Sequence, residues 1–429
     1  MKLRVLILGL ATVWPGFALT LQEAVDFAAK TNPEVQMARL QTTAAELEAF
    51  RAKTALRPQL SVSVGAAYQT TNLQGIGLIF PGLPARVGPY RTFDARPVLT
   101  ATVYDATLRA NVKAATERIW ESAQSAVALR ERTQLIVITT YLAALQADSR
   151  NRAALARIEN AEASLKQVKD RVDAGTANKL DLARATEQVD RERAIAIEAT
   201  RDREVLVTML MKHIGLSTTE LVSLSEVAPA GVIKTAMQDI EQQALTSRAE
   251  VLSLDAKRKA LVREVEAASK QRWPKLSVFG NYGVLGSSPN QSLSTYAVGG
   301  TVTVPIYTGR RIETEVKQAL LKLQLMDQEK RQVENAIRQE VNQAIAEWRG
   351  ASALAATRLK VIGSAKEAME LAKLRYEAGL TTNLDVVTAQ SSLSQAEEEE
   401  IHARYDMLIA RARVAGAQGN VVSFFDSAN

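Results

Sequence analysis

A tandem duplication constrains this chain more than any other feature of its sequence. The segment RVDAGTANKLDLARA at Arg171–Ala185 returns as RYEAGLTTNLDVVTA at Arg375–Ala389, about 204 residues later. A second pair of segments supports the duplication, because PQLSV at Pro58–Val62 returns as PKLSV at Pro274–Val278. A unit of more than about 200 residues is too long for a solenoid repeat, so we expect two fused copies of one half-structure.

Both copies of the first segment interrupt a helical pattern with a glycine. Gly175 and Gly379 can adopt φ > 0 and end a helix. Beyond the second glycine, Thr382 and Asp385 form a variant capping box, in which we expect the hydroxyl and the carboxylate to satisfy free N–H groups of a new helix. Each segment therefore predicts a tight helix–turn–helix tip.

The N-terminus has the features of a secretory signal peptide. Lys2 and Arg4 precede the apolar run Val5–Val13, and small residues follow up to Ala18, after which we expect cleavage. The sequence contains no cysteine. Its absence excludes disulfides in an oxidising compartment, and it also excludes a lipidated cysteine after the signal.

Two hairpins of strands are predicted, at residues 58–104 and 274–307. In each, apolar residues alternate with Ser, Thr, Asn or Gly, and this period of two indicates a strand with one apolar and one polar face. In the first hairpin we expect a Gly- and Pro-rich loop over residues 75–97 and a second strand at Val98–Tyr104. The apolar stretch Leu73–Tyr90 within this loop has no assigned role; an external loop or a disordered segment are the two alternatives.

Long helices follow each hairpin, at residues 105–173 and 308–378. The first contains no Pro or Gly, and from Arg310 to Ala378 only Gly350 and Gly363 interrupt the second. About 70 residues correspond to a helix about 100 Å long. Shorter helices are expected at Leu21–Lys30, Pro33–Leu56, Asp181–Lys212, Ala244–Arg272 and Asp385–Val414.

The helix lengths predict how the two copies are arranged. Two short helices placed end to end span roughly 87 Å, which nearly matches one long helix. Each long helix can then be flanked by two short ones, with strands at one end and tips at the other. The chain is predicted to begin with a signal peptide (1–18) and a first repeat (19–214) with its tip at 174–181. A mid-height linker or belt (215–240) then leads to a second repeat (241–414) with its tip at 379–385, and a C-terminal belt segment follows (415–429).

Four short strands cannot close a barrel alone, and open strand edges are not tolerated in lipid. Several copies must therefore pool their strands. With the apolar faces toward lipid and the small polar residues inward, the result is a water-filled β-barrel. A soluble β-sandwich cap on a coiled coil is the alternative, but the rest of the chain offers nothing to cover its apolar face. The predicted fold is mainly α, with long α-helical coiled-coil hairpins in two fused repeats and a small β part.

The sequence offers little support for an enzyme or a nucleic-acid-binding protein. The net charge of +6 is spread along the chain, without clusters of Lys and Arg interleaved with aromatics. His213 and His402 lie on unrelated predicted helices, which argues against a zinc or catalytic histidine site. No phosphate-binding loop or nucleophile elbow is present. We therefore expect no catalytic residues, no metal and no cofactor.

The residues described above resemble the TolC-type outer-membrane factor family over the whole mature chain. The resemblance rests on the opening LTLQEAVDFAAKTNPEV at Leu19–Val35, the Pro-x-Leu-Ser strand starts, Val304–Tyr307 before the second long helix, and the paired Ala-Gly…Leu-Asp tips. It implies a homotrimer whose hairpins build one β-barrel in the lipid of the outer membrane and whose helices form a periplasmic tunnel. The tips would meet a periplasmic adaptor (membrane fusion protein) and an inner-membrane transporter.

Two functions fit this shape. The first is a passive exit duct of a tripartite efflux pump or a type I secretion system; the second is a non-conducting periplasmic coiled-coil tether anchored in the outer membrane. Small polar residues on the inward strand faces favour a lumen, namely Ser61, Ser63, Thr301 and Thr303. The cargo, the transporter class and the resting state of the aperture stay open.

The tips contain the candidate functional residues. Asp181 and Asp385 can be helix caps, stabilised by about 0.3–1 kcal/mol through the helix dipole. Alternatively they form rings of carboxylates at the tunnel mouth, which would favour cations. Tyr376 is either a packing residue between helices or a gate, and Gly175 and Gly379 are structural.

The second tip departs from the family pattern. In a well-known member an arginine stands at the position of Thr381 and a second acid at the position of Thr388. Two threonines cannot form the salt bridge that locks a closed aperture, and of these charged groups only the acid at Asp385 is kept.

Overall fold

The computed structural model describes residues 18–79, 81–82, 84–216, 223–227 and 237–426. The predicted signal peptide and most of the predicted linker at residues 215–240 therefore lie outside the described residues. The chain divides into two compact units. The first comprises Met1–Leu40, Gln124–Leu252 and Gln332–Asn429, and the second comprises Gln41–Ala123 and Ser253–Arg331.

Helices dominate the structure, and two of them are very long, as predicted. The helices of the first copy are α1 (Leu21–Thr31), α2 (Pro33–Thr54), α3 (Ala106–Asp173, 68 residues) and α4 (Lys179–Ile214). Those of the second copy are α5 (Met237–Ser247), α6 (Ala249–Lys270), α7 (Arg311–Glu377, 67 residues) and α8 (Asn383–Ala417), followed by the short α9 (Ser423–Asp426).

Side-chain caps mark where α1 and α3 begin. Thr20 and Glu23 form a capping box before α1: the Glu23 N–H donates to Thr20 Oγ1 at 3.3 Å, and the Thr20 N–H donates to Glu23 Oε2 at 2.9 Å. The hydrogen bonds that the Thr20 N–H and hydroxyl donate to the Glu23 carboxylate lower its pKa. At α3, Asp105 Oδ1 accepts from the N–H groups of Thr107 (2.8 Å) and Leu108 (3.1 Å). Both caps satisfy amide groups that the helix itself leaves unpaired.

Two of the predicted helices differ from the structure for a reason that the structure shows. The expected single helix Ala244–Arg272 is two helices, α5 and α6, with Arg248 between them. The break buries Arg248 to 9% exposure and directs its guanidinium to Glu340 and Glu250. The second long helix begins at Arg311 rather than at 308, because Gly309 (φ 56°) and Arg310 (φ 63°) adopt left-handed conformations that cannot continue a helix.

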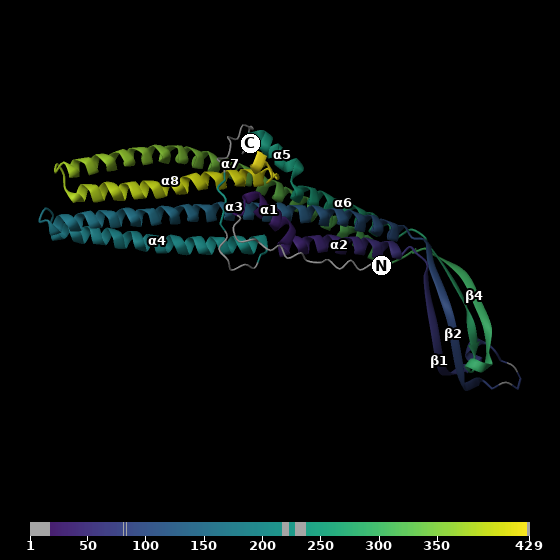
Figure 1. Cartoon of the computed structure of the whole chain (residues 1–429). Coiled ribbons are helices and arrows are strands. Elements are labelled where there is room, and N and C mark those ends of the chain that lie inside the picture. Colours follow the sequence, from purple (N-terminus) through teal and green to yellow (C-terminus); the bar gives the residue numbers. More distant parts are fainter. Residues whose placement is uncertain (1–17, 80, 83, 217–222, 228–236, 427–429) are drawn as a thin grey trace. The chain divides into compact units, whose positions relative to one another are not determined.

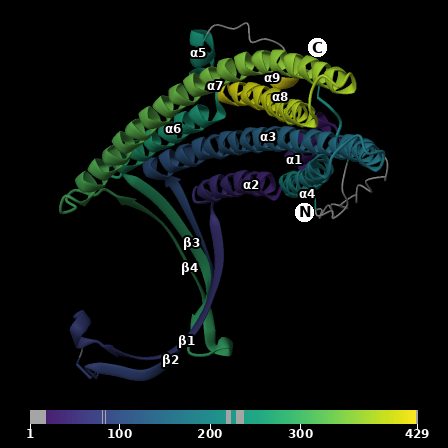
Figure 2. The same ribbon diagram turned by 90° about the vertical axis from the view of Figure 1, so that its left-hand side faces the viewer.

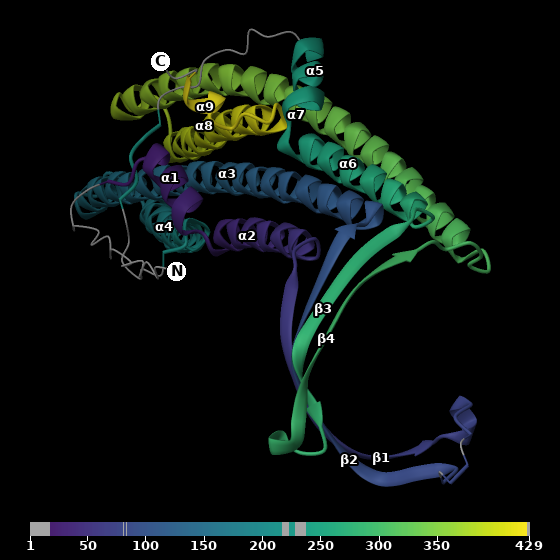
Figure 3. The same cartoon turned by 90° about the vertical axis from the view of Figure 1, so that its right-hand side faces the viewer.

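In the second unit, four antiparallel strands form one sheet in the order β1–β2–β3–β4 (Figures 2 and 3). Their bounds are β1 Gln59–Asn72, β2 Arg86–Tyr104, β3 Lys275–Gly286 and β4 Ser292–Thr303. Short 3-10 turns lie between the strands of each hairpin, at Gln74–Ile76 and Pro289–Gln291. The two strands at the edges, β1 and β4, each pair with a neighbour on one side within the described residues.

The predicted start of the second strand was wrong. We expected a loop over residues 75–97, but β2 begins at Arg86 and contains both Pro89 and Pro97. It pairs with β1 from Thr100 to Arg86, with an irregularity between Gln69 and Thr71. The 14-residue β1 needs a partner of similar length to pair its backbone groups. The hydrogen bonds gained along β1 therefore favour a strand here, although prolines locally favour a loop.

The first unit has a continuous apolar core contributed by α1, α3, α4 and α8. Ile138, Tyr141 and Leu142 of α3 lie at its centre with 0% exposure. The Tyr141 hydroxyl is hydrogen-bonded to the carbonyl oxygens of Leu19 (2.6 Å) and Ser225 (2.8 Å), and burial raises its pKa. The Tyr141 hydroxyl therefore connects α3 to the segments around Leu19 and Ser225. These two segments also pair with each other through a β-bridge between Leu19 and Leu224.

A second cluster lies within the second copy of the repeat. Ile240 of α5, Val341 of α7 and Val414 of α8 are at most 1% exposed and pack together. Within the first unit, α3 with α4 and α7 with α8 form two antiparallel hairpins whose free ends are the predicted tips (Figure 1).

Candidate functional site

The sheet has two chemically different faces. Residues opposite each other in antiparallel strands point to the same side, so the pairings Leu60–Leu99, Leu99–Gly280 and Gly280–Val298 define one row across all four strands. Extending this register gives an apolar face that includes Val62, Val64, Phe93, Val278, Tyr282, Tyr296 and Val302. The polar face includes Ser61, Ser63, Thr92, Asp94, Arg96, Thr100, Ser277, Asn281, Thr295, Thr301 and Thr303.

The apolar face is exposed to an extent that a free sheet in water would not tolerate. Val62 is 71% exposed, Tyr296 75% and Val298 80%. Exposed apolar patches of this kind mark a surface that meets lipid or another protein. On the polar face, Arg96 pairs with Asp94, so this charge pair is directed away from the apolar side.

The two tip turns have the same backbone geometry. Gly175 (φ 74°) and Gly379 (φ 71°) are left-handed. In the first tip the Thr176 N–H donates to the Arg171 carbonyl at 2.8 Å; in the second the Leu380 N–H donates to the Arg375 carbonyl at 2.9 Å. Together with glycine N–H bonds to the carbonyls three residues earlier, these bonds form a Schellman motif at the end of α3 and of α7.

The helices after the turns begin differently, and one cap prediction was wrong. At α4, Asn178 is the N-cap, and its side chain accepts from the Asp181 N–H at 2.9 Å. At α8, Thr382 is the N-cap residue, but its side chain makes no capping hydrogen bond. The Asp385 carboxylate instead accepts a hydrogen bond from the Thr381 hydroxyl. In a capping box, the Asp385 carboxylate would accept a hydrogen bond from the backbone N–H of Thr382, whereas here it accepts one from the Thr381 hydroxyl.

The remaining tip candidates are distributed as follows. Thr381 and Asp385 are brought together, and Asp385 is exposed. The Thr388 hydroxyl donates to the Leu384 carbonyl of its own helix at 2.8 Å. Asp181 is half-buried in the first turn of α4. The carboxylate rings predicted for Asp181 and Asp385 thus stay predictions.

Tyr376 contacts the other tip, and the sequence did not identify the partner of this residue. The guanidinium carbon of Arg171, at the end of α3, lies 4.6 Å from the centre of the Tyr376 ring. A cation over an aromatic face contributes about 0.5–1 kcal/mol at an exposed site. Arg171 aligns with Arg375 in the repeat, but this alignment does not predict a contact with Tyr376.

A pocket of about 410 Å³ lies between the two hairpins and is lined by α3, α4, α7 and α8. Arg157 of α3 and Glu192 of α4 form an ion pair at its wall (Nε–Oε2 3.2 Å), with side chains 6% and 4% exposed. Gln188 Nε2 donates to Glu192 Oε1 at 2.8 Å. Glu397 of α8 lies 4.0 Å from Arg157 Nη1, so this buried cluster spans both copies of the repeat.

Further polar contacts join α3 to α8 nearby. Arg150 Nε donates to Glu398 Oε1 at 3.0 Å, and Ser149 Oγ lies 3.0 Å from the Tyr405 hydroxyl oxygen. The hairpins are therefore connected by side chains along several turns.

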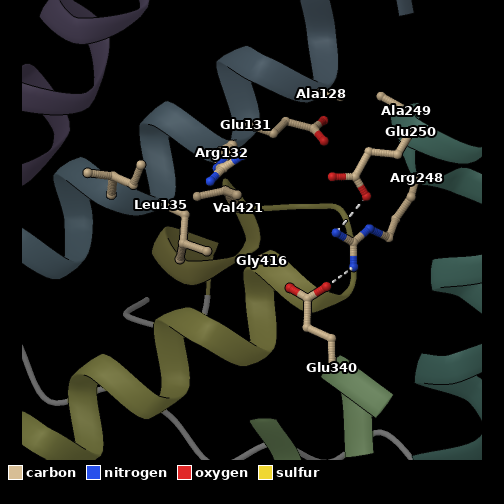
Figure 4. Close-up of a pocket in the computed structure, with 11 residues that line it drawn as sticks. Ala128, Glu131, Arg132, Leu135, Arg248, Ala249, Glu250, Glu340, Gly416 and Val421 are labelled. Carbon is tan, nitrogen blue, oxygen red and sulfur yellow. Dashed lines mark hydrogen bonds and ion pairs between the residues drawn. The ribbon is translucent and has the colours of Figure 1, made fainter. Parts of the chain in front are cut away.

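A second pocket of about 410 Å³ lies farther from the tips, where α3, α7 and α8 meet the start of α6 (Figure 4). Arg248 binds Glu340 at 2.7 Å and Glu250 at 2.8 Å. Glu131 of α3 faces the same pocket, and burial raises the pKa of its carboxyl. The pocket contains charges of both signs, and Arg248 pairs with two of its glutamates.

Across the part of the chain that the structure describes, no three His, Cys, Asp or Glu side chains are placed to hold a metal ion. None of the described helices is long and apolar enough to cross a membrane.

Comparison with known proteins identifies the family. The sequence matches the outer membrane efflux protein family over residues 24–216 and 240–420. It is 24% identical over 426 residues to the outer membrane efflux protein BepC of Brucella suis, covering 94% of this chain and 86% of BepC. It is 22% identical over 416 residues to the pyoverdine export outer membrane protein OpmQ of Pseudomonas putida, covering 95% and 87%.

The fold is also shared with solved structures. The outer membrane protein VceC of Vibrio cholerae superposes with a TM-score of 0.78 at 16% identity, covering 93% of this chain and 96% of VceC. The amphipathic sheet, the duplicated helical hairpins and the match over both repeats agree: the chain belongs to the outer membrane efflux protein family.

Proposed function

We propose that three copies of this chain assemble into one outer-membrane channel, which passively conducts substrates out of the cell from a periplasm-spanning complex. The amphipathic four-stranded sheet with two open edges carries this proposal. Its apolar face requires lipid, its polar face requires water, and its edges require further strands.

The dimensions support pooling of strands. With strands about 4.8 Å apart and tilted by about 40°, four strands would enclose a circle only about 8 Å across between backbones. Side chains alone would fill that space. Twelve strands, four from each of three copies, give a backbone diameter of about 24 Å and leave an aqueous lumen.

The tips are the proposed docking end for a periplasmic adaptor and an inner-membrane transporter. Exposed leucines support this role, since Leu180 is 56% exposed in the first tip and Leu380 is 71% exposed in the second. The complex would be a tripartite efflux pump or a type I secretion system, and the protein would act as a duct rather than as an enzyme.

Two measurements test the channel. Native mass spectrometry of the protein purified in detergent should give a trimer, and planar bilayers containing it should show discrete conductance steps. A monodisperse monomer that retains its β structure would contradict the pooled barrel. A trimer without conductance would favour the tether that the sequence left as the alternative.

Docking at the tips can be tested in the same way. A photo-crosslinking residue in place of Leu380 should capture an adaptor protein in cells, whereas one in place of Val298, on the apolar sheet face, should not. Equal capture from both positions would refute the assignment of the tip as the docking end.

A further inference from the structure

An arginine lies on the lipid-facing side of the sheet. In β2, Phe93 and Ala95 belong to the apolar face, and Arg91 follows them at the next position on the same side. Its partner on β1 is Tyr68, which continues the apolar series Val62, Val64 and Ala66. Tyr68 is 76% exposed, and Arg91 is also exposed. The apolar face therefore ends in a tyrosine–arginine pair.

This pair lies beyond the end of the second hairpin. The last pairing between β2 and β3 joins Phe93 to Gly286, whereas β1 and β2 continue together to Asn72 and Arg86. Figures 2 and 3 show β1 and β2 extending past the turn between β3 and β4. At the level of Arg91, β1 and β2 are the only strands of the sheet among the residues that the structure describes.

The height of Arg91 matches the far boundary of a bilayer. It lies ten residues along β2 from Ala101, which is on the same face near the helices. Ten residues at about 3.3 Å each and a tilt of about 40° give a height of about 25 Å. The apolar band of an outer-membrane barrel is about 25 Å tall and is flanked by aromatic girdles. Tyr68 has the position of a girdle residue, and Arg91 lies at the headgroup level.

The charge of Arg91 is not neutralised by the described residues. No ion pair or side-chain hydrogen bond of Arg91 is present among them, and no Asp or Glu occurs from Gln59 to Phe93. The contrast with Arg96 is direct, since Arg96 lies on the polar face and pairs with Asp94. An uncompensated guanidinium at the edge of an apolar surface favours a phosphate, which it can bind through two parallel hydrogen bonds.

We propose that Arg91, with Tyr68 beside it, binds the phosphate of a phosphorylated lipid in the outer leaflet of the membrane. The inference rests on the proposed barrel, because the barrel places the sheet end away from the helices in that leaflet. The lipid contributes both parts of the contact: its phosphate pairs with the guanidinium, and its acyl chains cover the apolar rows beneath. Three copies provide three equivalent sites around the barrel.

The test uses the full-length assembly purified in a non-ionic detergent. The assembly is incubated with bisphosphorylated lipid A, with the same lipid after removal of both phosphates, or with inorganic phosphate at equal phosphate concentration. Native mass spectrometry then counts the bound molecules. We expect retention of the phosphorylated lipid, much weaker retention of the dephosphorylated lipid, and no retained inorganic phosphate. This comparison requires no variant.

Substitution then assigns the site. Arg91→Gln should weaken binding of the phosphorylated lipid about fivefold per site, as expected for one basic residue at a membrane surface. Arg91→Lys keeps the charge but loses the two parallel hydrogen bonds, so it should bind the phosphorylated lipid more weakly than the native protein and more tightly than Arg91→Gln. The matched control Asp94→Asn/Arg96→Gln removes an arginine from the same strand on the opposite face without leaving an unpaired charge, and it should bind as the native protein does.

Equal retention of phosphorylated and dephosphorylated lipid would overturn the proposal. So would unchanged binding by Arg91→Gln, or an equal loss in the control. Conductance is measured on the same preparations. If the channel conducts but Arg91 does not select phosphate, the lipid site is refuted and the channel is retained; if it does not conduct, the proposed function fails independently of lipid binding.

Discussion

The buried ion pair between α3 and α4 allows the sharpest stability prediction for this protein. Arg157 and Glu192 are 6% and 4% exposed at their side chains, with 3.2 Å between Nε and Oε2. Removing one partner leaves a buried charge without its counter-ion, which costs about 3–5 kcal/mol. Glu397, 4.0 Å from Arg157 Nη1, compensates part of the arginine charge. We therefore expect Glu192→Gln to cost about 3 kcal/mol and Arg157→Met somewhat more.

The double variant Arg157→Met/Glu192→Gln should recover most of this loss. Methionine keeps the length and apolar character of the arginine stem, and glutamine still accepts the hydrogen bond that Gln188 donates to Glu192. Replacing both charges by neutral groups of similar shape removes the desolvation penalty together with the attraction, so the pair is close to neutral overall. The coupling between the two substitutions is the quantity that the experiment measures.

Hydrogen exchange of the backbone amides around residues 154–196 in the assembled protein reports the local free energy of opening. A loss of about 3 kcal/mol should accelerate exchange about a hundredfold in each single variant, and the double variant should exchange nearly as slowly as the native protein. Arg193→Met is the control, because it breaks an exposed pair with Glu162 (2.7 Å, 55% and 49% exposed) that should contribute less than about 1 kcal/mol. Single variants that exchange like the native protein, or a double variant as fast as the singles, would refute the reasoning.

Three further predictions concern the tip and the pocket of Figure 4. Gly379→Val should reduce transport while the barrel stays in the outer membrane, since a β-branched residue at φ 71° is strained; Gly363→Val, within α7, should transport normally, and equal transport by both variants would contradict a strained turn. Asp385→Asn should lower cation preference in single-channel recordings without loss of the trimer, and more than Asp181→Asn does; unchanged selectivity would leave Asp385 without a role in conduction. Burial raises the pKa of Glu131, so its contribution to stability is present below the ordinary pKa of 4.5 and is lost as pH rises through the folded value. Glu131→Gln should therefore raise the melting temperature at pH 7 but not at pH 4, and a lower melting temperature at pH 7 would show that the charged form is favoured.

Local patterns in the sequence determined most of the backbone. The glycines at 175 and 379 predicted two turns, and both glycines are left-handed in Schellman motifs. The alternation in the strands predicted one apolar and one polar face, and the register confirms them. These predictions succeed because helix ends and strand faces depend on residues within a few positions of one another.

Tertiary structure decided where side chains find partners and where strands end. β2 reaches back through Pro97 and Pro89 to Arg86 because the backbone groups of β1 need a partner along the whole strand. The pairing of Arg171 with Tyr376 and of Arg157 with Glu192 depends on the rotation of one helix against another, and a change of one residue in helical phase turns a side chain by about 100°. The local sequence pattern does not determine the rotation of one helix against another. This rotation follows from the packing of all the helices together, and it decides which charges are buried and which remain free to bind a partner or a lipid.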